Sequence, residues 1–375
     1  MRTKLTKSIS KRHWRVNRTR QWKVRTYRES DDAGIVNLIN LVWPNYSFDI
    51  KRWHWFKNNP LGHFASVGEH NGQIVGYMGL IPVDIKMGDN LIRGAQAVDL
   101  VVHPTFRRQG MFLEIGKALV KEAAENDISF FYGFPNEPAY YGHLKYGWFY
   151  VCDIPLLGRP NTYSARALIR GNLGRLREIR FSKKFVRSSV DLATNMFLNR
   201  KAAHKTPLVE DLKITSLLSF DERFDGFWNR VSNRYGIIVV RNTRYLRWRY
   251  FEKPETDYKV LAAEKDGRIE GYVILSITKS EYRKDGFIVD ALANSKHVAQ
   301  HLVRAALGYF SEEEVESIRC RMKENSLWYG ILKQNALLPL QSIKLIARIN
   351  SGKLSKTYES VAENWYTTMG DTVAL

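Results

Sequence analysis

Two stretches of the sequence occur twice, and this internal repeat constrains the fold more than any other feature of the chain. Residues 52–56 (RWHWF) reappear at 247–251 (RWRYF), and residues 71–80 (NGQIVGYMGL) match 266–275 (DGRIEGYVIL). Both pairs are 195 residues apart. Chance rarely keeps one offset across tryptophan, glycine and tyrosine positions, and self-similarity of this kind is a mark of duplicated structural units. The sequence therefore predicts two copies of one fold.

The two copies divide the chain into five expected segments. We expect the copies themselves to span residues 23–155 and 207–350. In this division residues 1–22 form a basic tail, residues 156–206 a basic amphipathic linker of helical character, and residues 351–375 a C-terminal tail. A chain of 375 residues is long enough to build two ordinary hydrophobic cores, which agrees with the division.

Each copy is expected to contain the same elements. A strand opens the copy, and helices, three strands, a helix, a strand, a short helix and a last strand follow. His-Asn-Gly at 70–72 and Lys-Asp-Gly at 265–267 predict a tight hairpin in each copy. The expected fold class is α/β (α+β): two tandem domains, each a mixed, mostly antiparallel twisted sheet flanked by helices.

Composition narrows the class of protein. No apolar stretch reaches the roughly 18 residues that a membrane span needs, and no apolar segment follows the charged start as it would in a signal peptide. The two cysteines, Cys152 and Cys320, have no metal-ligand spacing, so we expect no metal site and no disulfide framework. These features predict a cytoplasmic protein, and peripheral contact with a membrane surface stays open as an alternative.

The net charge of +20 is concentrated in two segments. Residues 1–28 hold 11 Lys and Arg and no acid, and residues 159–205 hold 12 basic residues against two acids. Such segments attract polyanions, so RNA, anionic lipid or a phosphorylated substrate is a possible partner. A solvated tail and linker would explain the same charge, and the oligomeric state cannot be read from it.

A basic, glycine-containing turn follows an apolar run in the first copy, at residues 101–112 (VVHPTFRRQGMF). A strand that ends in such a turn and leads into a helix presents backbone amides and the positive helix end to a ligand. Arg107 and Arg108 add formal charge, which suits a phosphate or diphosphate. The turn lacks the Gly-Lys-Ser/Thr of a P-loop and the three glycines of a dinucleotide fingerprint.

Two patterns in the first copy resemble the motifs of the GNAT acyltransferases. Residues 102–112 resemble motif A of that family, V-x-P-x-x-R/Q-x-x-G-x-G/A, and residues 136–148 (NEPAYYGHLKYGW) resemble its closing motif, N-x-x-A-x-x-x-Y-x-x-x-G-F. The two patterns occur in the order expected for the family. The resemblance covers residues 23–155 directly and residues 207–350 through the repeat.

The resemblance implies acyl transfer from coenzyme A, with acetyl-CoA as the expected donor, directly to a primary amine of a small molecule, amino sugar or peptide. In such enzymes the loop amides hold the diphosphate and the preceding strand pairs with the pantetheine. Phe112 departs from the motif, which has Gly or Ala there; its ring either crowds the diphosphate or points into the core, and we expect the second. The implied cofactor-binding residues are Leu100, Val101, Val102, Arg107, Arg108, Gln109, Gly110, Met111, Phe112 and Asn136.

Five residues are candidates for proton transfer. His143 stands where many members of the family have the tyrosine that protonates the leaving thiolate, and Tyr140 or Tyr141 could take that role instead. Asp99 and Glu137 are candidates for the base that accepts the proton of the amine. The second copy has an aspartate at the position of Asp99, which is equally consistent with a structural role.

The second copy lacks the Arg-x-x-Gly of the loop, so we expect it to bind no cofactor and to wall the acceptor cleft. With two GNAT-like copies and one expected cofactor site, the chain distantly resembles the Eis-type acetyltransferases. N-myristoyltransferases and Fem-type transferases have a similar tandem arrangement. Two alternatives remain: a Fem-like transferase that uses aminoacyl-tRNA, and a non-catalytic GNAT-like protein that binds RNA or membrane through its basic segments.

Overall fold

The computed structural model describes residues 21–46, 48–161, 212–281, 283–350 and 352–372. The expected basic tail and most of the expected linker lie outside these ranges. Within them, no helix is both long and apolar enough to cross a bilayer.

The first half contains the expected elements in the expected order. Its hairpin turns at Asn71 and Gly72, whose φ angles of +47° and +78° suit an asparagine–glycine turn. The elements are β1 (Lys23–Thr26), α1 (Asp32–Val42), α2 (Ile50–Lys57), β2 (Phe64–His70), β3 (Gln73–Met87), β4 (Asn90–Val102), α3 (Met111–Glu125), β5 (Phe130–Gly133), α4 (Glu137–Leu144) and β6 (Phe149–Pro160).

The second half repeats this succession and adds one short strand, β8 (Ile237–Val239), which pairs with β3 of the first half. A π-helical turn, η4 (Arg247–Phe251), continues α8 (Thr243–Leu246). The other elements are β7 (Lys213–Leu217), α7 (Arg223–Val231), β9 (Tyr258–Lys265), β10 (Arg268–Ser280), β11 (Arg283–Ala293), α9 (Lys296–Glu312), β12 (Ser317–Arg321), α10 (Leu327–Gln334) and β13 (Leu338–Ile349). The chain then forms α11 (Gly352–Val361), η5 (Ala362–Asn364) and η6 (Met369–Asp371).

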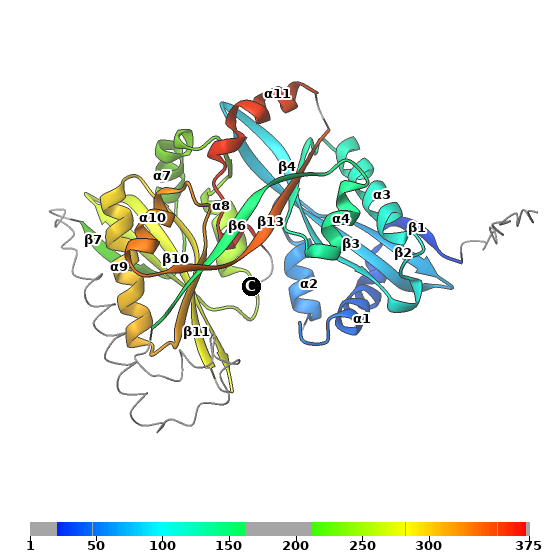
Figure 1. Cartoon of the computed structure of the whole chain (residues 1–375), viewed down its shortest axis with the longest axis horizontal. Helices are drawn as coiled ribbons and strands as arrows, with labels where there is room; N and C mark the ends of the chain where they lie inside the picture. The colour runs from blue at the N-terminus through cyan, green and yellow to red at the C-terminus, as the bar shows by residue number, and fades with distance from the viewer. Residues whose placement is uncertain (1–20, 47, 162–211, 282, 351, 373–375) are drawn as a thin grey trace, which may run out of the picture.

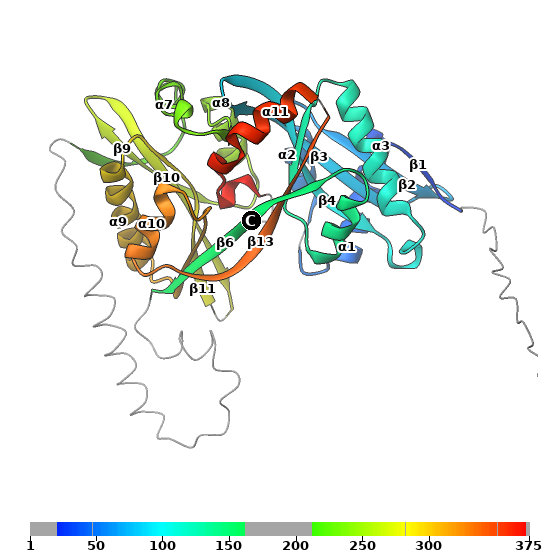
Figure 2. The same ribbon diagram turned by 45° about the horizontal axis from the view of Figure 1, so that its top comes forward.

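The described strands form one 13-stranded sheet in which the two halves exchange their last strands. Along the sheet the order is β1-β2-β3-β4-β5-β13-β6-β12-β11-β10-β9-β7. β5 of the first half therefore pairs with β13 of the second, and β12 of the second half pairs with β6 of the first. β6 and β13 cross the middle of the molecule side by side (Figures 1 and 2). The mixed, mostly antiparallel sheet with flanking helices confirms the expected α/β (α+β) class, but the two sheets expected from the repeat are joined into one because β6 and β13 pair across the halves.

Helices cover both faces of the sheet in the first half. Ile35 and Leu38 of α1 pack in one buried cluster with Tyr77 of β3, whereas Ile115 of α3 packs in another with Met78. Because side chains alternate between the faces of a strand, α1 and α3 lie on opposite sides of β3. Each face thus has a core of its own, and anything that crosses between the faces must pass between strands.

The repeated aromatic motif packs the two halves against each other. The rings of Trp55 on α2 and Trp248 on η4 stack with centroids 4.9 Å apart and planes 8° from parallel. Trp55 Nε1 donates to the carbonyl of Trp248 at 2.8 Å, and Trp248 Nε1 donates to the carbonyl of Trp55 at 3.1 Å. Both side chains are buried, so this contact fixes one half on the other.

We expect Trp55→Ala to lower the free energy of unfolding by about 3–5 kcal/mol, since the substitution leaves a large cavity and an unpaired carbonyl at Trp248. Urea unfolding measures the change. Leu218→Ala is the control: Leu218 is 92% exposed, so its loss should change stability by no more than about 0.5 kcal/mol. Equal effects of the two substitutions would contradict this account of the interface.

Candidate functional site

β4 and β5 separate within the sheet of the first half. The two strands pair in parallel only where residues Gly94 to Ala97 face Phe130 to Gly133. β4 continues to Val102, whereas the chain leaves β5 at Phe134 and Pro135 and turns into α4. The edge of β4 beyond Ala97 therefore faces no strand of the described sheet, and its backbone groups can pair with an extended ligand.

A bulge in β4 lies at the point where the strands separate. The register between β3 and β4 shifts between Tyr77 and Gly79, so that Asp99 and Leu100 together oppose one residue of β3. Asp99 has a φ of +49°, in the left-handed region. That backbone is strained for a residue with a side chain, by roughly 1 kcal/mol or more, and such strain is concentrated at functional sites.

A cavity of about 350 Å³ opens where β4 and β5 part. Its lining comes from both faces of the sheet: Tyr46 belongs to the side of α1 and α2, and Leu100 to the side of α3. A ligand on one face can therefore meet a ligand on the other through this opening. The lining residues are Trp43, Tyr46, Met78, Gln96, Ala97, Val98, Asp99, Leu100, Gly133, Phe134, Pro135, Asn136, Ala139, His143, Ile346 and Thr372.

Asp99 is a carboxylate that can take up a proton near neutral pH. Burial raises its pKa to about 6, although the positive charge of Arg52 and a hydrogen bond from Tyr46 oppose the shift. Arg52 Nη2 in turn donates to the Tyr46 hydroxyl at 2.7 Å. Asp99 and Tyr46 both line the cavity, so the carboxylate lies where an amine could deliver a proton.

His143 lies at the cavity as a neutral ring. Burial lowers its pKa to about 4, and Nδ1 is 2.8 Å from the carbonyl of Ala139, to which a neutral ring donates. The ring contacts Phe112 at 5.2 Å and Trp148 at 5.0 Å between centroids, both nearly perpendicular. With Nδ1–H engaged, Nε2 can only accept a hydrogen bond, so His143 in this state is no proton donor.

Three other candidates for proton transfer lie on α4 but not among the lining residues of the cavity. Tyr141 is 58% exposed and Glu137 is exposed on the first turn of the helix. Tyr140 is half-buried, with Lys344 Nζ 5.3 Å from its ring centroid. Reaching the cavity would require a movement of each side chain.

The loop after β4 contains two residues in the left-handed backbone region and leads directly into the N-terminus of α3. Arg108 and Gly110 have φ angles of +60° and +88°, and Gly110 precedes the 15 residues of α3 without a side chain to cap it. The first amides of α3 have no acceptor within the helix. Arg107 Nε donates to the carbonyl of Val102 at 3.1 Å, and Gln109 Oε1 accepts from Trp22 Nε1 at 3.2 Å.

The side chains at the start of α3 point away from the loop. Phe112 packs on α4, where a Cβ added to Gly142 would meet its ring at 2.5 Å. Met111 is buried against β2 and β3, and a Cβ on Gly76 would clash with its sulfur at 2.6 Å. The Phe112 ring is thus packed against α4 and His143 and is not turned into the loop.

The other residues predicted to bind the cofactor lie in different surroundings: at the cavity, in the hydrophobic core, or at the end of a helix. Leu100 lines the cavity, Val101 is buried in the core, and Val102 is half-buried at the end of β4. Asn136 lines the cavity and also caps α4, since its Oδ1 accepts from the amide of Ala139 at 3.0 Å.

Sequence reasoning did not single out several lining residues. Tyr46 lies in the connection between α1 and α2, Ile346 on a strand of the other half, and Thr372 more than 270 residues from Asp99. None of them belongs to a motif or a periodic pattern. In the described parts of the chain, no cluster of three or more His, Cys, Asp or Glu residues could hold a metal ion.

Residues 23–150 match the model of a family described as an acetyltransferase (GNAT) domain. No match was found among curated protein sequences. The two patterns that predicted the loop and the closing helix thus lie within the region that matches this model.

Solved structures extend the likeness over both halves. A GCN5-related N-acetyltransferase from Anabaena variabilis matches with a TM-score of 0.62 and 11% identity, over 88% of this chain and 72% of that chain. N-myristoyltransferase of Saccharomyces cerevisiae with bound myristoyl-CoA matches at 0.59 and 11%, over 88% and 83%. A probable N-acyltransferase from Enterococcus faecalis matches at 0.59 and 13%, over 88% and 72%. The chain therefore has the fold of these GNAT acyltransferases.

The raised pKa of Asp99 has a consequence for stability. Because the folded state holds this proton up to about pH 6 and the unfolded state only to about pH 4, stability falls as the pH rises from 4 to 6. The asparagine of Asp99→Asn does not titrate, so its free energy of unfolding should not fall in this way. As the pH rises from 4.5 to 7, the stability of the variant, measured by urea unfolding, should therefore increase by about 1–3 kcal/mol relative to that of the wild type. If the stabilities of the two proteins changed with pH in parallel, the pKa of Asp99 would not be raised in the folded state.

Proposed function

We propose that this protein is an acyl-CoA-dependent N-acyltransferase of the cytoplasm that transfers an acetyl group to a primary amine. The acceptor is a small molecule, an amino sugar or a peptide. The observation that carries the proposal is the parting of β4 and β5, which opens a cavity between a free strand edge and a loop built to bind an anion. The match of residues 23–150 to the family model of GNAT acetyltransferase domains supports this proposal.

The donor lies along β4 in this proposal. The edge of β4 from Val98 to Val102 pairs with the pantetheine as an added strand, and one backbone amide there polarises the thioester carbonyl. The loop amides and the first turn of α3 hold the diphosphate, with the charges of Arg107 and Arg108 nearby. Asn136 borders the acyl end of this path.

The acceptor reaches the thioester from the side of α1 and α2, past Trp43 and Tyr46. Its nitrogen attacks the thioester carbon, and one proton of the amine passes to Asp99. The carbon–sulfur bond then breaks, coenzyme A leaves as a thiolate, and the proton taken up by Asp99 returns to that thiolate directly or through water. A carboxylate of pKa about 6 is ionised at neutral pH, yet it is a stronger base than an ordinary aspartate. Of the five proton-transfer candidates Asp99 fits its role best, and His143 serves to accept a hydrogen bond.

The second half is a degenerate GNAT-like domain in this proposal. Its helix α9 follows β11 after only Asn294 and Ser295, whereas eight residues, 103–110, connect β4 to α3. The two-residue connection between β11 and α9 is too short to surround a diphosphate. The division into two domains at the expected boundaries stays part of this proposal, with β6 pairing with strands of the second half and β13 with strands of the first.

We also propose that the basic segments 1–28 and 159–205 contact an anionic partner, either RNA or an anionic membrane surface. Their charge is the observation in favour. A Fem-like use of aminoacyl-tRNA would require RNA binding together with a donor path that rejects acetyl-CoA, so the donor experiment below also tests that alternative.

We expect calorimetry to detect micromolar binding of acetyl-CoA to the wild-type chain. Arg107→Glu should abolish it, because the substitution places a negative charge beside the diphosphate. Arg268→Glu is the matched control: it reverses an exposed charge on the β9–β10 hairpin of the second half and should leave the affinity within about twofold. Unaltered affinity in Arg107→Glu would count against the proposed donor site.

Thiol release across a panel of amino sugars, aminoglycosides and peptides would identify the acceptor. With an acceptor in hand, Asp99→Asn should lower kcat by about 10² to 10⁴-fold, the usual contribution of a general base. The wild-type rate should rise with pH through about 6, where Asp99 ionises, and the variant should lack this dependence. A variant with the wild-type pH profile would assign the base elsewhere.

A further inference from the structure

The second half has the same gap between strands as the first. β11 and β12 pair in parallel only where Asp285 to Ile288 face Ser317 to Cys320, and β11 continues to Ala293. A register shift in the pairing of β10 with β11 places a bulge next to Asp290, the counterpart of Asp99 in the sequence repeat. The geometry that opens the cavity in the first half is thus present twice.

The C-terminal segment Trp365 to Thr372 fills this second gap. Thr368 forms an antiparallel bridge with Met322, directly after β12. From the same segment the Tyr366 hydroxyl donates to the carbonyl of Ala291 on β11, and Thr368 Oγ1 donates to Asp290 at 3.0 Å. Every residue of the segment is buried. The chain itself takes the place between the strands that a ligand takes in the first half.

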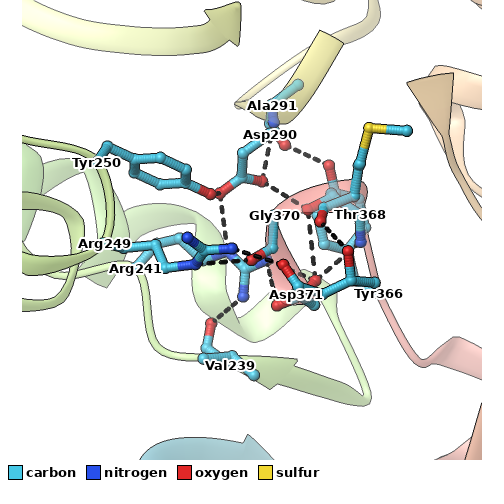
Figure 3. A network of polar contacts seen from close by, with 12 residues as sticks. Val239, Arg241, Arg249, Tyr250, Asp290, Ala291, Tyr366, Thr368, Gly370 and Asp371 are labelled. Atoms are coloured by element: carbon cyan, nitrogen blue, oxygen red, sulfur yellow. Dashed lines mark hydrogen bonds and ion pairs between the residues drawn. The ribbon is translucent and has the colours of Figure 1, made fainter. Parts of the chain in front are cut away.

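A buried charge network locks the segment in place (Figure 3). Arg241 Nη2 lies 2.8 Å from both carboxylate oxygens of Asp371, and its Nε lies 3.5 Å from Asp290. Tyr250 donates to Asp290 at 2.9 Å. Arg241 is 1% exposed and Asp290 fully buried. Removing one partner of such a network leaves another charge buried and uncompensated, so the segment is held strongly.

The network also fixes the position of Thr372. Arg249 Nε donates to the carbonyl of Gly370 at 3.1 Å, and its Nη2 donates to that of Thr372 at 2.6 Å. A side chain on Gly370 would collide with the Tyr250 hydroxyl, so the backbone approaches as only glycine allows. Thr372, held in this way, lines the cavity of the first half together with Trp43 and Tyr46.

We propose that the segment 365–372 is a built-in occupant of the second gap whose anchoring makes Thr372 a fixed wall of the first half's cavity and a determinant of which amine fits. Asp371 is then a positioning residue, which acts on the cavity through Thr372. The role in amine selection rests on the proposed function; the anchoring does not.

The anchoring can be measured without turnover. In a Cys152→Ser background, where the other native thiol, Cys320, is fully buried, Thr372→Cys supplies a thiol on the cavity wall. The probe is 2-aminoethyl methanethiosulfonate, a small reagent that carries a primary amine, and intact mass follows its labelling of the full chain. Adding Asp371→Asn should accelerate labelling at least about tenfold, because Arg241 loses the charge that it binds.

Two further variants control this experiment. Asp285→Asn removes another paired carboxylate of β11, 2.6 Å from Arg283, and should leave the labelling rate within about twofold. Thr368→Val keeps the ion pair but loses the hydrogen bond to Asp290, so a smaller acceleration is expected if Asp371→Asn does not fold. Unchanged rates in Asp371→Asn and Thr368→Val would overturn the proposal.

Donor binding separates this inference from the proposed function. The affinity of Asp371→Asn for acetyl-CoA should stay within about twofold of that of the wild type, since β4 and its loop belong to the first half. A loss of affinity equal to that of Arg107→Glu would mean that the segment supports the whole fold. That result would overturn the proposal. Wild type that binds no acetyl-CoA defeats the proposed function, while the labelling still decides the anchoring. In the amine panel, Thr372→Phe should slow large acceptors more than small ones, and an unchanged ranking would refute the role in selection.

Discussion

The exchange of β6 and β13 between the halves is the constraint on which the rest of the structure depends. Each crossing strand supplies the neighbour that the other half's short strand needs, so β5 is held by β13 and β12 by β6. With its outer edge paired in this way, β5 can stop at Gly133 and leave the edge of β4 open. The cavity is consequently composite: Ile346 of β13 lines it together with residues of the first half.

Local features of the fold could be predicted from the sequence, and the exchange could not. Asn-Gly and Asp-Gly turns need positive φ angles, which Asn71, Gly72, Asp266 and Gly267 have. Turn chemistry and periodicity depend on neighbouring residues, so one sequence displays them. The partner of a strand is set by contacts far along the chain, and nothing in residues 149–160 indicates that β6 extends past residue 155 and pairs with β12 and β13 of the second half.

The same distinction applies to the candidate site. The motif patterns led to Asp99, Leu100, Asn136 and His143, all of which border the cavity. The protonation state of His143 could not be read from them, because it depends on burial by the aromatic rings of Phe112 on α3 and of Trp148 just before β6. Thr372 could not be found either, since its place is fixed by ion pairs that join residues 130 positions apart.

The repeated aspartate shows how one duplicated geometry can serve two purposes. Asp290 is enclosed by Arg241, Tyr250 and Thr368, and although burial raises the pKa of this carboxyl too, its contacts are all made within the protein, where it serves as an anchor. Asp99 lies in a bulge beside an open cavity, and burial raises its pKa to about 6 although Arg52 and Tyr46 oppose the shift. A gap filled by the chain makes the carboxylate structural, whereas an open gap leaves it able to exchange a proton with a ligand. Occupancy of the gap, more than the residue itself, therefore decides which of the two carboxyl groups a ligand can reach.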